Sequence, residues 1–262
     1  MVIDSHCHLD RLDLARHEGS LAAALQAARD AGVGRFLNVS IDLENFPAVR
    51  EIAHQFEDVW CSVGVHPGSH EGEEPTVERL VSLAADPKVI ALGETGLDYY
   101  YGTDTKAVQQ ERFRVHLRAA RQTRKPVIVH TRDAREDTLE IIREESDPEV
   151  GGILHCFTES WEMAKAAIDQ NFMISFSGIV TFKNAVELKE VARKVPLEHL
   201  LVETDSPYLA PIPYRGKPNE PQWVTHVAAY VAELRGMSTA ELMAATTQNF
   251  ERLFPATARA CQ

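Results

Sequence analysis

The sequence predicts a (β/α)₈ barrel, also called a TIM barrel, and three observations carry this prediction. Short apolar segments alternate with amphipathic helical segments along the chain, as they do in parallel sheets built from βαβ units. Eight strand segments of this kind fit within 262 residues, a usual length for such a barrel. Histidine, glutamate or aspartate directly follows most of these segments. A doubly wound open sheet is the alternative fold that the same alternation allows.

The expected strands are short apolar runs bounded by glycine, proline or polar residues. The first begins at Val2-Ile3 and runs into His6-Cys7-His8. The others are expected at residues 35–40, 59–65, 89–93, 126–129, 152–154, 172–176 and 200–202.

The expected helices have apolar residues spaced three and four apart, so that one face is buried. They are expected at residues 20–31, 44–56, 76–85, 108–123, 137–145, 161–169, 185–194, 222–235 and from 238 toward 250. Gly32 is a stop signal for the first helix, and Ser238 with Glu241 forms a capping box that opens the last one. We predict one domain over residues 1–262, because no internal boundary or low-complexity segment interrupts this alternation.

Composition indicates a cytoplasmic protein. No apolar run approaches the ~18–20 residues that cross a bilayer, and the N-terminus lacks the pattern of a secretory signal. The four cysteines form no C-x-x-C pair, which favours free thiols in a reducing compartment over disulfides or thiolate zinc sites. They are Cys7, Cys61, Cys156 and Cys261. We expect no membrane association and no obligate protein partner.

The formal net charge of −12 argues against a broad basic surface that coats nucleic acid. It does not exclude an enzyme that acts locally on a phosphodiester, because bound cations can supply positive charge there.

Two histidines at the end of the first strand are the first candidates for a metal site. Side chains two apart in a strand share a face, so His6 and His8 project together while Cys7 points into packing on the other side. Two imidazoles directed at one point suit a divalent cation. The alternative is an ordinary pair of polar residues at a strand end.

Other strand ends carry the same residue types, and catalytic groups of a barrel sit at these ends. The further candidates are His66, Glu94, His130, His155, Glu203 and Asp205. Burying so many imidazole and carboxylate groups without a partner would be costly, which favours a metal centre. For the remaining histidines we expect structural roles, as solvated or partly buried side chains; they are His17, His54, His70, His116, His199 and His226.

The ligand set fits Mg²⁺, Mn²⁺ or Zn²⁺. Because the cluster offers more ligands than one cation needs, we expect two divalent cations that share Glu94 as a bridge and activate a water. Asp205 is the expected ligand and general base. Glu203 is expected to orient Asp205, with a salt bridge inside the barrel as the alternative.

Several motifs resemble the TatD family of metal-dependent deoxyribonucleases, and the 214–221 loop resembles its YcfH-like branch. The motifs lie at residues 3–9, 63–67, 93–98, 129–134, 155–157 and 202–208, so the resemblance spans nearly the whole chain. It implies a TIM barrel of the amidohydrolase superfamily that hydrolyses DNA phosphodiesters with divalent metal, often as an exonuclease.

The resemblance also implies residue roles. His6 and His8 would bind one metal, His130 and His155 the other, with Glu94 as the bridge and Asp205 as ligand and base. His66 would contact substrate phosphate. Arg132 is a further phosphate candidate because of its charge, with a surface salt bridge as the alternative. Single-stranded DNA ends are the expected substrate. The alternative is an esterase or amidohydrolase such as a D-aminoacyl-tRNA deacylase, because the same centre could cut an ester.

Overall fold

The computed structural model describes residues 1–69 and 71–258 of the chain. One parallel sheet of eight strands forms its centre, and each strand pairs with the next along the sequence. The strands are β1 (Val2–Cys7), β2 (Val33–Asn38), β3 (Val59–Val63), β4 (Val89–Asp98), β5 (Val127–Arg132), β6 (Gly152–Leu154), β7 (Phe172–Phe176) and β8 (Leu200–Val202). This sequential order confirms the predicted (β/α)₈ barrel. The open-sheet alternative is wrong, because a doubly wound sheet reverses its strand order at a switch point.

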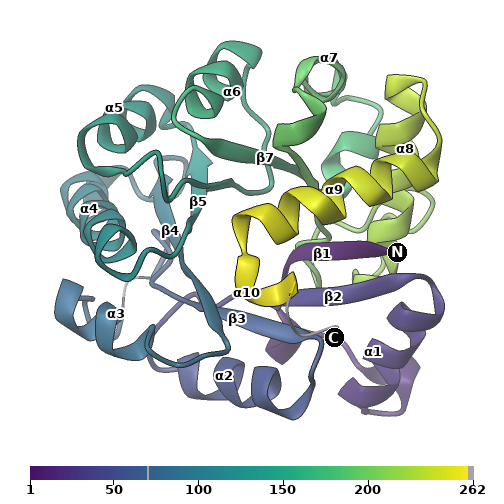
Figure 1. The fold of residues 1–262 in the computed structure, drawn as a ribbon, viewed down its shortest axis with the longest axis horizontal. Helices are drawn as coiled ribbons and strands as arrows, with labels where there is room; N and C mark the ends of the chain where they lie inside the picture. Colours follow the sequence, from purple (N-terminus) through teal and green to yellow (C-terminus); the bar gives the residue numbers. More distant parts are fainter. Residues whose placement is uncertain (70, 259–262) are drawn as a thin grey trace.

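The helices surround the strands, and α9 crosses one end of the barrel (Figure 1). The α-helices are α1 (Leu21–Asp30), α2 (Phe46–Gln55), α3 (Val77–Leu83), α4 (Lys106–Thr123), α5 (Arg135–Glu145), α6 (Trp161–Ile168), α7 (Val186–Lys194), α8 (Val224–Arg235), α9 (Thr239–Leu253) and α10 (Pro255–Ala258). Short 3₁₀ turns lie at Leu9–Arg11, Ala15–His17, Thr103–Thr105, Gly178–Thr181, Leu197–His199 and Pro221–Trp223. The predicted capping box of Ser238 and Glu241 opens α9.

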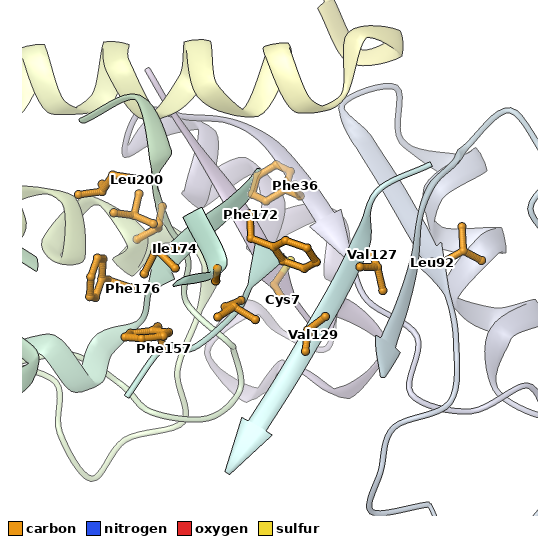
Figure 2. Close-up of a cluster of buried hydrophobic side chains, with 14 of the residues drawn as sticks. Cys7, Phe36, Leu92, Val127, Val129, Phe157, Phe172, Ile174, Phe176 and Leu200 are labelled. Atoms are coloured by element: carbon orange, nitrogen blue, oxygen red, sulfur yellow. The ribbon is translucent and has the colours of Figure 1, made fainter. Parts of the chain in front are cut away.

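Two apolar clusters hold the barrel together. Inside it, every strand contributes a buried side chain, and α9 closes the end with Phe250, Leu253 and the following Phe254. The strand residues are Ile3, Leu37, Trp60, Ile90, Ile128, Ile153, Met173 and Leu201. Outside the barrel, alternate strand residues pack under the helices, with Phe36, Phe172 and Phe176 among them (Figure 2). This division leaves the opposite end of the barrel available for polar side chains.

The barrel closes between β1 and the segment that follows β8. Asp205 N–H donates to the carbonyl oxygen of His6 at 2.9 Å. Beside this bond, the fully buried Asp4 accepts the N–H of Thr204 at 2.9 Å and its hydroxyl at 2.6 Å. The first and last strand ends are therefore fastened to each other where both carry candidate site residues.

Most elements end within three residues of their predicted limits, and β4 is the exception. We expected β4 to end at Gly93, but it continues to Asp98, because its second half pairs with β5. Within the described residues, no helix is both long and apolar enough to cross a membrane. Two residues with sequence predictions, His70 and Cys261, lie outside the described ranges.

Candidate metal centre

His6 and His8 meet at the carboxyl end of β1. Their Nε2 atoms lie 3.3 Å apart, and both side chains are buried. Cys7 points the other way into the apolar layer outside the barrel, where its thiol lies 3.4 Å from the Leu37 carbonyl oxygen (Figure 2). The predicted alternation is therefore confirmed for these three residues. It holds only locally, because the pairing register between β1 and β2 shifts between Asp4 and Cys7. An irregularity of this kind changes the direction of the side chains at the strand end.

Glu94 lies between two groups of imidazoles. Its Oε2 atom is 3.4 Å from His6 Nε2 and 4.0 Å from His8 Nε2. Its Oε1 atom is 2.7 Å from His155 Nε2 and 3.3 Å from His130 Nδ1. Burial acts to raise the pKa of Glu94, but the neighbouring histidines, His155 above all, outweigh burial and hold that pKa well below its usual value. Glu94 is therefore an ionised carboxylate with one oxygen directed at each group.

Asp205 joins the group formed by the β1 histidines. Its Oδ1 atom lies 3.4 Å from His8 Nε2 and 3.7 Å from His6 Nε2. The residue has a φ of 55°, a left-handed conformation that aspartate tolerates better than most residues. Burial opposes ionisation, but the hydrogen bond with His8 and the charge of His6 hold the pKa of Asp205 below its usual value. Asp205 is thus in its basic form.

The strand period directs His130 and His155 into the barrel. His130 follows the interior residue Ile128 by two positions on β5, and His155 follows Ile153 in the same way at β6. The rings of His155 and His6 stack with centroids 3.9 Å apart. Residues that are far apart in the sequence therefore converge on Glu94.

Hydrogen bonds on the outer side of three rings leave the inner nitrogens free to bind a cation. His8 Nδ1 lies 2.9 Å from the Val39 carbonyl oxygen, and His155 Nδ1 lies 3.2 Å from Glu203 Oε1. His130 Nε2 lies 3.2 Å from Asp98 Oδ2. Since these acceptors hold a ring proton on each outer nitrogen, the inner nitrogens are the ones that can bind a cation once they are deprotonated.

His66 has the opposite arrangement. Gly68 N–H donates to its Nδ1 atom at 2.9 Å, so the ring proton lies on Nε2, which is 3.4 Å from Glu94 Oε1. Burial lowers the pKa of His66 to about 3, so the ring is neutral. Its position beside Glu94 and His130 is close enough for a shared cation. Its protonated Nε2, however, favours donation to an anion over ligation.

Glu203 is buried in the barrel wall, and its contacts differ from the one expected with Asp205. Its Oε1 atom accepts the Cys156 N–H at 2.8 Å and faces His155 Nδ1. Within the described residues, the side chain of Glu203 makes these two contacts and none with Asp205. The expectation of a Glu203–Asp205 pair assumed that strand alternation continues past Val202, whereas β8 ends there and Asp205 adopts a positive φ.

The donor set fits divalent cations. Three buried atoms of the cluster have no hydrogen-bond partner among the described residues: His6 Nδ1, His155 Nε2 and Glu203 Oε2. When the ring proton of His155 lies on Nδ1, its Nε2 atom and the nearby Glu94 oxygen are both acceptors without a proton between them. A cation between these two atoms would remove this unfavourable contact. Three groups of residues each offer ligand atoms that lie within 4.8 Å of one another: His6, His8 and Asp205; His6, His155 and Glu203; and His66, Glu94 and His130.

The cluster forms the base of a pocket of about 550 Å³. Its wall includes Arg11, Arg132, Tyr208 and the half-buried Cys156. The guanidinium of Arg132 stacks on Tyr100, with its central carbon 3.9 Å from the ring centroid. Among the described residues, no carboxylate forms a salt bridge with Arg132, so the salt-bridge alternative for this residue is wrong.

Two residues of the site carry no role in the sequence predictions. Asp98 lies four positions after Glu94 on one strand, a spacing that puts both carboxylates on the same face. Asp4 precedes the histidine pair on β1 and anchors Thr204 between the two carboxylate residues that follow β8. Burial raises the pKa of Asp4 to about 8.

Known proteins match this chain over nearly its whole length. The sequence model of the family described as TatD related DNase matches residues 3–255. The uncharacterized metal-dependent hydrolase YcfH of Escherichia coli (strain K12) is 51% identical over 253 residues, covering 97% of this chain and 95% of that protein. The 3'-5' ssDNA/RNA exonuclease TatD of Shigella flexneri serotype 5b is 35% identical over 233 residues, covering 87% and 90%. The crystal structure of YJJV, a TatD homolog from Escherichia coli K12, has a TM-score of 0.89 at 31% identity and covers 97% and 98%.

Proposed function

The chain belongs to the TatD family of metal-dependent hydrolases, and from that premise we propose that it hydrolyses phosphodiester bonds at the ends of single-stranded DNA. The name of the Shigella relative, an exonuclease of single-stranded DNA and RNA, supports this substrate class. The observation that carries the proposal is Glu94, whose two oxygens face separate imidazole groups at the base of an open pocket.

The proposed centre holds two divalent cations. His6, His8 and Asp205 would hold one, His130 and His155 the other, and Glu94 would contact both. When bound, such cations acidify water and neutralise charge on a phosphoryl group. Mg²⁺, Mn²⁺ and Zn²⁺ are the candidates, since imidazole and carboxylate ligands suit all three to different degrees.

The side chains around the cluster have separate roles in the proposed reaction. Asp205, ionised and beside His8, would accept the proton of the attacking water. The water oxygen then bonds to phosphorus while the ester P–O bond breaks, and the departing oxygen takes up a proton from solvent, which yields a phosphate monoester and a free hydroxyl end. His66 Nε2–H and the guanidinium of Arg132 are the donors available for phosphate oxygens on the pocket wall.

Charge and thiol chemistry support an enzyme that engages strand ends inside the cytoplasm. With a net charge of −12, the protein would repel long duplex DNA outside the local site. The described cysteines are free thiols at Cys7, Cys61 and Cys156, as expected in a reducing compartment.

The test is a direct comparison of two substrates. Purified protein is supplied with Mg²⁺, Mn²⁺ or Zn²⁺ and incubated with end-labelled single-stranded DNA or with D-aminoacyl-tRNA. We expect shortened DNA and no faster release of the amino acid than without protein. Glu94→Gln and Asp205→Asn should each slow DNA cleavage by at least about 100-fold.

The control for both variants is Glu251→Gln on α9, which pairs with Arg35 away from the pocket. This variant should keep wild-type cleavage. Release of the amino acid with intact DNA would replace the nuclease proposal with the deacylase alternative. Cleavage that persists in both site variants would refute the assigned centre.

A further inference from the structure

Two tyrosines stand exposed on the loop that follows β4. The side chains of Tyr100 and Tyr101 are 56% and 73% exposed, and their rings meet edge to face with centroids 4.7 Å apart. A single exposed apolar side chain is common and needs no explanation. Two adjacent exposed aromatic rings that contact a residue of the pocket wall indicate a surface that a ligand covers.

Arg132 connects these rings to the pocket. Its guanidinium carbon lies 3.9 Å from the Tyr100 ring centroid and 5.0 Å from that of Tyr101, and the residue lines the pocket wall. Stacking occupies the face of the guanidinium and leaves its N–H edge free. Because no carboxylate of the described chain forms a salt bridge with it, this edge is available to an anion.

Asp98 fixes the loop relative to the metal centre. Its Oδ1 atom accepts the N–H of Tyr100 at 3.0 Å and the N–H of Tyr101 at 3.1 Å, while its Oδ2 atom lies 3.2 Å from His130 Nε2. Arg132 follows His130 by two positions on β5, so the two side chains share a face about 7 Å apart. One carboxylate thus holds both the aromatic loop and a candidate metal ligand.

From this geometry we propose that Tyr100, Tyr101 and Arg132 form a nucleotide subsite beside the bond to be cut. The base of an unpaired nucleotide stacks on the tyrosine rings, and its phosphate binds the N–H edge of Arg132. Aromatic side chains bind bases of any sequence in this way. A base inside a duplex has both faces occupied, so the subsite selects unpaired ends. This inference rests on the proposed function and adds the part of the chain that recognises the substrate.

The test measures binding to a phosphorothioate oligothymidine, which resists hydrolysis and keeps its charge. The double variant Tyr100→Leu/Tyr101→Leu keeps apolar bulk and loses the aromatic faces. We expect the metal-loaded variant to bind this strand about 10- to 100-fold more weakly than wild type. The matched variant Tyr100→Phe/Tyr101→Phe keeps the rings and should bind like wild type.

A phosphorothioate strand whose sugars lack bases separates stacking from a structural effect. Wild type and the leucine variant should bind this strand equally. Equal binding of the base-containing strand by both proteins would overturn the proposal, and so would an equal loss on both strands. If the tyrosines prove to bind the strand but the protein cuts no DNA, only the nuclease assignment is contradicted. If the protein cuts DNA but the leucine variant binds the strand as tightly as wild type, only the subsite is contradicted.

Discussion

At the residue scale, the partner of one ring nitrogen decides what the other nitrogen of a histidine can do. His8 and His155 each direct Nδ1 at an oxygen, which leaves Nε2 to the cluster. His66 receives the Gly68 N–H at Nδ1 and therefore carries its proton on Nε2. Residues of one type thus separate into candidate ligands and a candidate donor through the contact that the other ring nitrogen makes.

Glu203→Gln tests whether Glu203 acts through His155. With an amide in place of the carboxylate, the Nδ1–H of His155 loses its charged acceptor. We expect the affinity for Mn²⁺ or Zn²⁺ to fall by about 10- to 100-fold, the range typical for partners of metal-bound histidines. Isothermal titration calorimetry measures this change, with Glu251→Gln as the unaffected control. Unchanged affinity in Glu203→Gln would show that this contact does not support a metal ligand.

Strand alternation allowed part of the cluster to be predicted. It correctly gave the shared direction of His6 and His8 and the burial of Cys7, because those faces follow from neighbouring positions. The contact of Glu203 with His155 could not be predicted, since it joins residues 48 apart across two strands. Only the folded barrel brings these side chains together.

At the element scale, the length of β4 decides which acidic residues reach the site. A glycine usually weakens a strand, so the sequence predicted an end at Gly93. The strand instead continues because its residues from Thr95 to Asp98 pair with those of β5 from Val129 to Arg132. The extra residues carry Asp98 to His130, which is why the sequence predictions missed this carboxylate.

His116 joins helix α4 to β4, through Thr95, and to the segment that follows β3. Val65 N–H donates to His116 Nε2 at 3.1 Å, and His116 Nδ1–H donates to the Arg112 carbonyl oxygen at 2.8 Å. The expected structural role of His116 fits these contacts, but the side chain is fully buried, whereas a solvated or partly buried one was expected. Protonation of Nε2 would remove the acceptor for Val65, and burial lowers the pKa of His116 from 6.5 to about 4.

This burial makes the free energy of unfolding depend on pH. Between pH 6.5 and 4 the unfolded chain binds a proton at His116 that the folded chain excludes, so stability falls as pH falls. The loss reaches about 3 kcal/mol at pH 4 and is about 2 kcal/mol at pH 5. His116→Gln, which does not titrate, should lack this share of the loss between pH 7.5 and 5 in urea unfolding.

The control for His116→Gln is His54→Gln, at an exposed position beside Asp86. It should retain nearly the whole pH dependence of wild type. A His116→Gln variant whose stability falls as steeply as that of wild type would show that this histidine titrates normally in the folded protein.

At the scale of the whole molecule, the barrel gathers residues from β1 to β8 at one end and closes the other end with α9. Alternation and strand count predicted this architecture, because both are local patterns that few folds satisfy. The closure by Asp4 and Thr204, 200 positions apart, and the plug formed by Phe250 could not be predicted. They depend on contacts between distant segments that no local pattern encodes.

The proposed role of Glu94 concerns the whole molecule, because we propose that the barrel end holds two cations through this one carboxylate. Native mass spectrometry of protein loaded with Mn²⁺ or Zn²⁺ counts the ions directly. We expect about two ions per wild-type chain and no more than one in a Glu94→Ala variant that remains folded. Two ions retained in Glu94→Ala, or none in the wild type, would contradict the account.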